Sequence, residues 1–222
     1  MTSAPADDER LAVGLREGVD VLGLALSKDQ QRQLLQHLAL IARWNRVYNL
    51  TAVRDPAQML TQHLLDSLAV VQPLRRHTGG GAISLLDVGS GAGLPGVAIA
   101  VACPEVAVSC VDAVAKKASF VRQVAAELGL RRFSALHARV ESLTAKSYQV
   151  VTSRAFASLA DFVVLTESVL APGGVWMAMK GQVPDDEIAA LPPAVEMFHV
   201  EPLRVPGLDA ERCIVWMCRK DD

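Results

Sequence analysis

The residues with the clearest chemical character form a glycine-rich stretch at 87–96, which reads Asp-Val-Gly-Ser-Gly-Ala-Gly-Leu-Pro-Gly. It lies between an apolar, strand-like run at 83–88 and a helical run that ends near Cys103. Glycine lets a backbone turn sharply and come close to a ligand that a Cβ atom would exclude. We therefore expect a ligand at the carboxyl edge of a parallel sheet, beside the N-terminus of the first helix after the loop.

Two cofactor classes fit this loop. The G-x-G-x-x-G spacing of dinucleotide-binding proteins is present at Gly91, Gly93 and Gly96. An NAD(P)-dependent oxidoreductase is therefore an alternative. Asp87 and Gly89 extend this to D-x-G-x-G-x-G, which resembles the first motif of methyltransferases that use S-adenosylmethionine. Pro95 lies where a pyrophosphate-binding helix would need a free N–H. These details favour S-adenosylmethionine as the cofactor.

Two further positions follow strands that should end at the same edge. Asp112 closes the second strand-like run, about 20 residues beyond the loop, where an acid can accept hydrogen bonds from ribose hydroxyls. The alternative for Asp112 is a helix cap before Ala115. Val140 and Glu141 close the third run, where a backbone N–H and an acceptor side chain can bind the edge of an adenine ring. A solvated strand end is the alternative there.

The sequence also limits the kind of methyl transfer. Amino-group methylation of bases usually uses an Asn/Asp-Pro-Pro-aromatic loop after the fourth strand, but this chain has Ser153-Arg154-Ala155-Phe156 there. Carbon-5 methylation of pyrimidines needs a cysteine nucleophile, and Cys103 is expected on the wrong side of the sheet. A ring nitrogen with a lone pair, such as guanine N7, needs neither a nucleophile nor a base. The sequence is compatible with that class, and we expect no general base.

The elements that must position these residues change character along the chain. Ser27 and Gln30 have capping-box spacing and predict a helix with an apolar face. Asp55-Pro56 predicts a second helix start, and Gln72-Pro73 its end. His77 to Gly81 is the expected linker. We therefore predict a poorly determined segment at 1–26, helices packed on the core at 27–76, and an α/β domain at 82–222, all within one compact unit.

From residue 83 onward, strand-like and helical runs alternate, which predicts a parallel sheet covered on both faces. The strand-like runs are expected at 83–88, 107–111, 133–140, 148–153, 175–179, 195–203 and 213–219, with helices to Cys103, from Ala115 to Leu130, and from Leu159 to Leu170. The last two runs flank a turn-forming Pro206-Gly207-Leu208-Asp209 stretch, so they predict a closing antiparallel pair. The expected fold class is a Rossmann-like α/β methyltransferase fold, with a mostly parallel seven-stranded sheet preceded by a helical segment.

Composition and local sequence features argue against several classes of protein. The chain of 222 residues is 51% hydrophobic and has a formal charge of −2, which argues against a protein that coats nucleic acid non-specifically. Its four cysteines form no C-x-x-C pair, so no metal site is expected. The N-terminus resembles no secretion signal, and glycines and prolines interrupt the longest uncharged stretch. A cytoplasmic protein with no membrane segment, and a monomer, is the expectation.

At this point the residues resemble the ribosomal RNA small subunit methyltransferase G family, whose older name is glucose-inhibited division protein B. The likeness covers about residues 30 to 220 and rests on a joint set of motifs: Trp44-Asn45, Tyr48-Asn49-Leu50-Thr51, His63-Leu64-Leu65-Asp66-Ser67, Asp87 to Gly91 with Leu94-Pro95-Gly96, Ser153 to Leu159, Lys180-Gly181-Gln182 and Asp185-Asp186-Glu187.

The resemblance implies methylation at N7 of one guanine of 16S rRNA, guanine 527 in the usual 16S numbering, with S-adenosylmethionine as donor. The partner would be 16S rRNA or a precursor of the small ribosomal subunit. The resemblance also implies that five positions contact the cofactor: Gly89, Leu94, Val140, Glu141 and Arg154. A small-molecule methyltransferase on the same fold stays open as the alternative, because the chain is slightly acidic.

Several polar residues are candidates for binding the substrate. His63, Asp66 and Ser67 share one helix face, where they could line the substrate mouth or form a buried network that joins the first helices to the core. Arg154 is expected at the methionine carboxylate or an RNA phosphate, and Lys180 at a phosphate. Trp44 and Tyr48 could stack on a base, but two aromatic residues four positions apart on an apolar helix favour the core. Basic residues that could contact RNA are Arg43, Arg46, Arg54, Lys116, Lys117, Arg122, Arg131 and Arg132.

Overall fold

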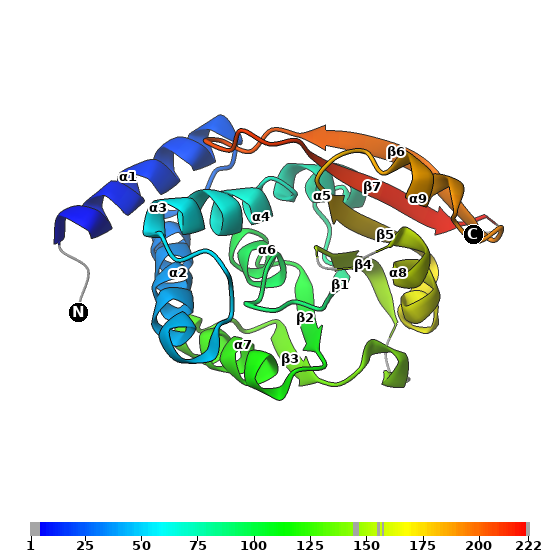
Figure 1. Cartoon of the computed structure of the whole chain (residues 1–222), viewed down its shortest axis with the longest axis horizontal. Coiled ribbons are helices and arrows are strands. Elements are labelled where there is room, and N and C mark those ends of the chain that lie inside the picture. The colour runs from blue at the N-terminus through cyan, green and yellow to red at the C-terminus, as the bar shows by residue number, and fades with distance from the viewer. Residues whose placement is uncertain (1–4, 144–146, 155, 157, 221–222) are drawn as a thin grey trace.

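A computed structural model describes residues 5–143, 147–154, 156 and 158–220 of the chain. The described residues contain a seven-stranded sheet with the strand order β3-β2-β1-β4-β5-β7-β6 (Figure 1). The strands are β1 (Ser84–Val88), β2 (Ala107–Asp112), β3 (Phe133–His137), β4 (Tyr148–Ser153), β5 (Leu170–Lys180), β6 (Val195–Leu203) and β7 (Arg212–Arg219). The first five run parallel, whereas β7 is antiparallel to β5 and β6 is antiparallel to β7. The predicted fold class is confirmed.

Helices cover both faces of this sheet. Those after β1 are α6 (Gly96–Ala102), α7 (Ala115–Leu128), α8 (Leu159–Thr166) and α9 (Asp185–Ala189), with 3₁₀ turns η2 (Val140–Ser142) and η3 (Glu167–Val169). Successive side chains of a strand point to opposite faces. In β1, Leu85 therefore belongs to a core shared with α2, α6 and α7, and Leu86 to a core shared with α8. The central strands β1 and β2 are buried on both faces, which is why they read as continuous apolar runs, whereas the edge strands β3 and β6 are partly exposed.

Several predicted boundaries are wrong, including the start of the fifth strand, which was expected at Val175 but lies at Leu170. The third strand was expected to reach Val140, but it ends at His137, and Val140 opens the turn η2. The helix from Leu159 was expected to reach Leu170, but it ends at Thr166, and Leu170 already pairs with Tyr148 of β4. Apolar runs of this length do not distinguish a buried strand from a buried helix.

The first part of the chain is helical. It contains α1 (Pro5–Val21), α2 (Lys28–Tyr48), α3 (Pro56–Met59), the π-helical segment η1 (Leu60–Leu65), α4 (Asp66–Leu68) and α5 (Val71–Thr78). The predicted capping box of α2 is present: the Gln30 N–H donates to Ser27 Oγ, and the Ser27 N–H donates to Gln30 Oε1. Asp55 caps α3 by accepting the Gln58 N–H at 2.9 Å.

The expected helix end at Gln72-Pro73 is wrong. Pro73 is the third residue of α5, where its missing N–H would have had no helical partner in any case. The helix ends instead at Gly79, whose φ is +61°, so His77 and Thr78 of the expected linker are helical.

The N-terminal helices form a continuous core with the α/β part. Leu34 and Ile41 of α2 are fully buried in the same cluster as Leu85 of β1. The segment at 5–21, which the sequence pattern left without a structure, is the helix α1, which packs on α2 and η1 and buries Leu15. In the part of the chain that the structure describes, no helix is both long and apolar enough to cross a bilayer.

Candidate functional site

The glycine loop connects β1 to α6 at the carboxyl edge of the sheet. Gly89, Gly91 and Gly93 have φ angles of +68°, +57° and +77°, a region that L side chains rarely adopt. At Gly93 a Cβ atom would lie 2.7 Å from Val97 Cγ2, so glycine is required there on two grounds. The loop folds on itself, because the N–H groups of Gly93 and Leu94 both donate to the Ser90 carbonyl. Gly89 is exposed at the start of this tight turn, whereas Gly93 and Leu94 are buried. We refer to the turn at 89–94 as the cradle.

Asp112 fastens this loop to the end of β2. Its Oδ2 accepts the Gly91 N–H at 3.0 Å, and its Oδ1 accepts the Val114 N–H at 2.8 Å, just before α7. Asp112 therefore braces the loop and the residue before α7. The N-cap of α7 is Val114 and has no side-chain cap, so the alternative of Asp112 as a helix cap is wrong. Each carboxylate oxygen can accept a second hydrogen bond, so the side chain can still receive a ribose hydroxyl.

Asp87 is fully buried beneath the loop. Its Oδ2 accepts the Gly96 N–H at 2.8 Å, and Oδ1 has no hydrogen-bond partner among the described residues. Burial raises the pKa of Asp87 to about 7. The positive charge of Arg154 acts against this rise. Arg154 follows Ser153, whose Oγ donates to the Val88 carbonyl at the start of the loop at 2.8 Å. The carboxylate is thus an acceptor with unused capacity at the base of the cradle.

Val140 and Glu141 lie in η2, immediately beyond the carboxyl end of β3. Val140 is buried, whereas Glu141 is exposed. The Ala138 N–H donates to the Asp112 carbonyl at 3.3 Å, which ties this segment to β2. The loop, Asp112 and η2 therefore lie along one edge of the sheet, as the strand order requires.

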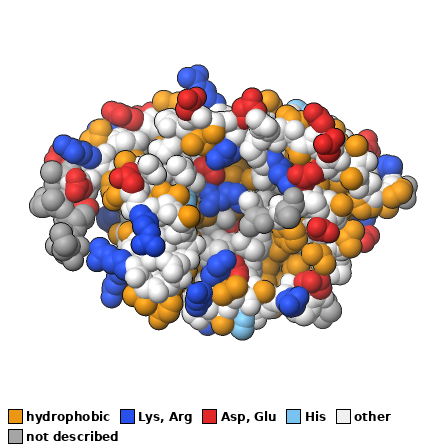
Figure 2. All heavy atoms as spheres, in the orientation of Figure 1, with side chains coloured by type: hydrophobic (Ala, Val, Ile, Leu, Met, Phe, Trp, Pro, Cys, Tyr) orange, Lys and Arg blue, Asp and Glu red, His pale blue; other side chains and the backbone are white. Residues whose placement is uncertain are grey.

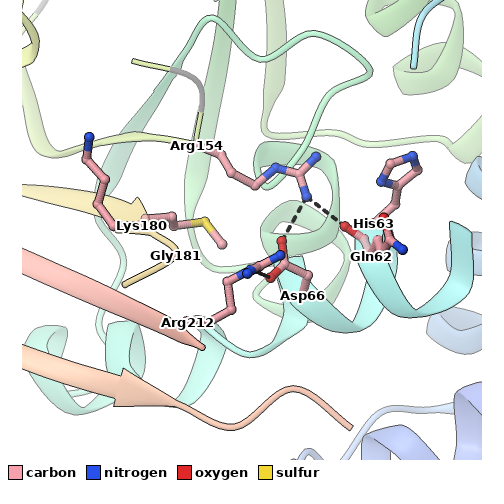
Figure 3. Close-up of a pocket in the computed structure, with 8 residues that line it drawn as sticks. Gln62, His63, Asp66, Arg154, Lys180, Gly181 and Arg212 are labelled. Atoms are coloured by element: carbon pink, nitrogen blue, oxygen red, sulfur yellow. Dashed lines mark hydrogen bonds and ion pairs between the residues drawn. The ribbon is translucent and has the colours of Figure 1, made fainter. Parts of the chain in front are cut away.

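A cavity of about 370 Å³ opens at the carboxyl ends of β4 and β5 (Figure 3). Its lining residues come from η1, α4, the end of β4, the end of β5 and the start of β7: Gln62, His63, Asp66, Arg154, Met179, Lys180, Gly181 and Arg212. Figure 2 shows Lys and Arg side chains within the hollow in the middle of this face. Four residues predicted from the sequence, His63, Asp66, Arg154 and Lys180, are brought together here.

Asp66 is the anion at the centre of the cavity wall. Its Oδ2 accepts Arg154 Nη1 at 2.9 Å, and its Oδ1 accepts Arg212 Nε at 2.9 Å (Figure 3). The Asp66 side chain is 3% exposed and each arginine side chain 27% exposed. Two guanidinium groups thus share one buried carboxylate, which leaves the group with a net positive charge. Arg212 was not predicted, because it is 146 residues from Asp66 and belongs to no motif.

The π-helical segment η1 shapes this wall. The Gln62 carbonyl accepts Arg154 Nη1 at 3.0 Å, so the helix backbone and Asp66 both hold the same guanidinium nitrogen. Short π segments within helices occur frequently at functional sites. His63 and Asp66 line the cavity, and Asp66 also joins the first helices to the end of β4 and the start of β7. Ser67 is fully buried and does not line the cavity.

His63 is buried at the rim, with Nε2 2.9 Å from Thr51 Oγ1. Burial, and then the positive charge of Arg154, lower the pKa of His63 below its ordinary value. The imidazole is therefore neutral near pH 7. Thr51 is held in turn by Asn45 of α2, whose Oδ1 accepts the Thr51 N–H at 3.0 Å.

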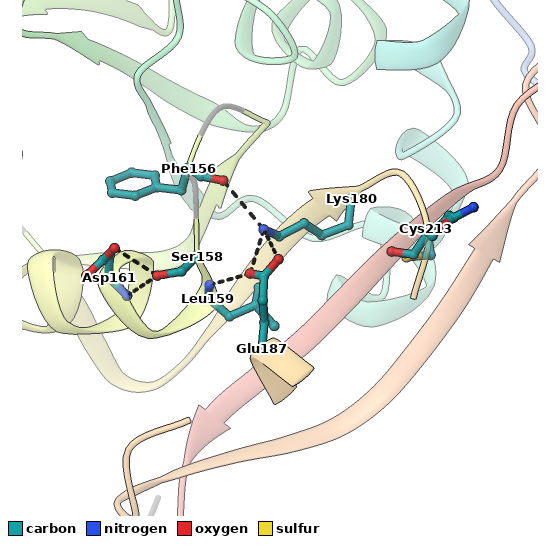
Figure 4. Close-up of polar contacts among 8 residues, drawn as sticks. Phe156, Ser158, Leu159, Asp161, Lys180, Glu187 and Cys213 are labelled. Carbon is teal, nitrogen blue, oxygen red and sulfur yellow. Dashed lines mark hydrogen bonds and ion pairs between the residues drawn. The ribbon is translucent and has the colours of Figure 1, made fainter. Parts of the chain in front are cut away.

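Lys180 ends β5 with its ammonium group paired to an acid (Figure 4). Its Nζ donates to Glu187 Oε2 at 2.7 Å and to Oε1 at 3.0 Å, and Oε2 also accepts the Leu159 N–H at the start of α8. The lysine charge is thereby offset, so Arg154 and Arg212 supply the excess positive charge of the cavity. Ala155 and Ala157 of the neighbouring motif lie outside the described residues.

Helices α2 and α7 pack side by side (Figure 1). Residues 30–54 and 115–126 contain no Asp or Glu but seven basic residues, which we refer to as the basic surface: Arg32, Arg43, Arg46, Arg54, Lys116, Lys117 and Arg122. Arg32 is paired with Asp29 at 2.9 Å, and Arg54 lies beyond the end of α2. Arg131 and Arg132 lie beyond the far end of α7. Trp44 packs edge-on against Phe120 of α7 at 5.2 Å, as a core residue should. Tyr48 was expected in the core, but it is 42% exposed because it is the last residue of α2.

No group of three or more His, Cys, Asp or Glu side chains within the described ranges is arranged to hold a metal ion. The four cysteines, all in described positions, are thiols.

Comparisons with known proteins agree with this geometry. The family model described as rRNA small subunit methyltransferase G matches residues 30–215. A protein of that name from Methylibium petroleiphilum is 74% identical over 220 residues, covering 99% of this chain and all of the relative. Another from Acidovorax ebreus is 63% identical, covering 91% of this chain and 93% of the relative.

Solved structures show the same fold at low identity. TrmN from Thermus thermophilus superimposes with a TM-score of 0.53 at 19% identity, over 72% of this chain and 53% of that one. A SAM-dependent methyltransferase from Aquifex aeolicus gives 0.51 at 14% identity, over 73% and 97%. Of the two cofactor classes considered for the glycine loop, the matches support the methyltransferase class. With its sequence matched over nearly its full length, the chain belongs to the rRNA small subunit methyltransferase G family.

Proposed function

We propose that this protein transfers a methyl group from S-adenosylmethionine to N7 of a single guanine of 16S rRNA, guanine 527 in the usual numbering. The observation that carries the proposal is the cationic cavity beside the glycine loop, in a chain whose relatives are named for methylation of small-subunit rRNA. The cavity holds excess positive charge next to the expected donor position, as an enzyme that acts on a polyanion requires.

The donor fits the loop and its neighbours. The positive-φ glycines form the cradle, in which a Cβ at Gly93 would clash with Val97, and Asp87 Oδ1 is a buried acceptor that can bind an ammonium group. Asp112 can accept ribose hydroxyls, while Val140 and Glu141 lie where an adenine edge would be bound. Gly89 and Leu94 contribute backbone to the cradle. When bound, S-adenosylmethionine supplies an electrophilic methyl group on a sulfonium.

The acceptor chemistry demands alignment rather than proton removal. The lone pair of guanine N7 forms the new N–CH₃ bond while the S–CH₃ bond breaks, and S-adenosylhomocysteine leaves. No proton is lost in this step, which agrees with a neutral His63 and with an Asp66 already committed to two arginines. The protein contributes by holding the base in line and by excluding water.

RNA binding is assigned to two positively charged features. Arg212 and the remaining donors of Arg154 can bind a phosphate next to the target base, although Arg154 can equally bind the methionine carboxylate. The basic surface of α2 and α7 then receives the more distant backbone. Its seven basic residues contrast with a whole chain that carries 22 Lys and Arg against 24 Asp and Glu. Six of those seven side chains are exposed.

The test is transfer of labelled methyl from S-adenosylmethionine to naked 16S rRNA and to small subunits that lack the modification. Nucleoside analysis and primer-extension mapping of the product follow. The expected product is 7-methylguanosine at one position, and the substrate form that accepts the label identifies the partner. A protein that binds S-adenosylhomocysteine but labels neither RNA nor particles would refute the proposal and indicate a small-molecule acceptor.

A further inference from the structure

His37 connects the first helices to the glycine loop. It lies in the middle of α2 and is fully buried, and its Nε2 is 2.8 Å from the carbonyl oxygen of Ala92. A carbonyl oxygen only accepts, so Nε2 must carry the proton. Nδ1 then has no hydrogen-bond partner among the described residues. The Ala92 carbonyl is therefore the polar contact that fixes the orientation and tautomer of this imidazole.

The carbonyl that His37 holds belongs to the most permissive part of the loop. Ala92 stands between Gly91 and Gly93, both with positive φ, so the backbone on each side has access to many conformations. The Ala92 carbonyl and the Gly93 N–H belong to one planar peptide group and point in opposite directions. Fixing the carbonyl toward α2 therefore directs the Gly93 N–H to the Ser90 carbonyl, which it contacts at 2.8 Å.

The His37 side of this hydrogen bond is held rigidly. Neighbouring α2 residues Leu34, Leu38 and Ile41 are buried in the main core, and the imidazole stacks near Phe120 with ring centroids 6.3 Å apart. Burial lowers the pKa of His37 to about 4, so the ring stays neutral, as the Nε2–H tautomer requires. Asp112 fastens the same loop from the opposite side through the Gly91 N–H. His37 and Asp112 thus clamp neighbouring residues of the loop.

We propose that His37 is a positioning residue for the methyl donor: its hydrogen bond to the Ala92 carbonyl holds the glycine loop in the conformation that binds S-adenosylmethionine. This inference rests on the proposed function for its cofactor, but not for its RNA substrate. His37 is fully buried and does not line the cavity, so we expect its effect on the affinity for the methyl donor rather than on RNA binding. The N-terminal helices accordingly form part of the donor site through one buried contact.

The test compares two substitutions. His37→Leu removes the hydrogen-bond donor and fills the site with an apolar side chain. His37→Gln can place an amide N–H near the position of Nε2. Ile41→Val, one turn further along the same buried face of α2, serves as a matched core perturbation that removes no hydrogen bond. For each protein we would measure the Kd of S-adenosylhomocysteine by calorimetry, the KM values for donor and RNA, kcat at saturating donor, and Tm.

We expect His37→Leu to raise the Kd of S-adenosylhomocysteine and the donor KM about tenfold, the loss of one hydrogen bond. Its kcat and its RNA KM should stay within about twofold of wild type, as should the donor Kd of His37→Gln. An unchanged Kd in His37→Leu would overturn the proposal, as would an equal rise in Ile41→Val or no recovery in His37→Gln. If His37→Leu does not fold, the comparison of His37→Gln with His37→Asn decides, because the shorter amide cannot reach Ala92 and should lose affinity. Since the Kd is measured without RNA, a failure to methylate rRNA would refute the proposed substrate alone.

Discussion

Replacing Asp87 by Asn should stabilise the ligand-free protein, and it should weaken the binding of S-adenosylmethionine. Asp87 is fully buried, and burial raises its pKa from 3.8 to about 7. Between these two pH values the folded protein holds a proton on this carboxyl group that the unfolded chain has released. The free energy of unfolding therefore falls as the pH rises from about 4 to about 7, and then stays level with respect to this group.

The magnitude follows from the size of the shift. A pKa difference of about 3 corresponds to about 4 kcal/mol, at about 1.4 kcal/mol for each pH unit. An asparagine amide oxygen can still accept the Gly96 N–H that Asp87 Oδ2 now accepts at 2.8 Å, so the neutral contact is kept. The variant should thus gain up to about 4 kcal/mol on wild type between pH 4 and pH 8. The donor would lose its ionic partner, so its affinity should fall.

The assay is urea unfolding of both proteins without ligand at half-unit steps from pH 4 to pH 8. The difference between the two curves isolates Asp87, because all other titrating groups are shared. Calorimetry with S-adenosylhomocysteine at pH 8 provides the functional measurement. A difference in unfolding free energy that does not change with pH would refute the reasoning, since it would show that Asp87 has no raised pKa in the folded state.

Two further substitutions test the cavity and the loop. Asp66→Asn should lower the free energy of unfolding by about 3 kcal/mol in urea, because it leaves Arg154 and Arg212 partly buried without their shared carboxylate; a loss below about 1 kcal/mol would contradict a structural role for this group. Gly93→Ala should lose donor binding in calorimetry, because its Cβ would lie 2.7 Å from Val97 Cγ2 at a φ of +77°. Gly80→Ala is its matched control, since Gly80 has a φ of +68° and open space around it. Equal donor affinity in these two variants would show that the clash at Gly93 is relieved without disturbing the loop.

Local signals predicted the elements of this fold well. The capping box at Ser27, the Asp55 cap and the apolar runs of β1, β2 and β4 are short-range features, and each is present where the spacing placed it. The helix end predicted at Pro73 was wrong because proline occurs both in the first turn of helices and after their ends, and only the neighbouring structure decides between the two. The end of β3 was also misplaced, because strand length depends on pairing with β2 rather than on residue type.

The candidate site could be predicted only in part. The loop, Asp112 and Arg154 could be predicted, because each follows a strand whose carboxyl end the topology brings to one edge. Arg212 and His37 could not be predicted, because their partners Asp66 and Ala92 are 146 and 55 residues away in the chain. Lys180 was recognised, but its neutralising partner Glu187 was not assigned a role, because the contact depends on how α9 folds back. Long-range polar contacts of this kind leave no periodic trace in a sequence.

The π-helical segment η1 also fixes how many residues this helix must contain. Each π-type hydrogen bond spans one residue more than an α-type bond, so the segment behaves as an α-helix with one inserted residue. Loss of one residue from this segment would let it relax to α geometry while Asp66 keeps its direction toward the two arginines. Loss of a second residue would turn Asp66 away from them, because an α-helix turns about 100° for each residue. The π segment therefore gives this helix a tolerance for one deletion that a regular α-helix of the same length lacks.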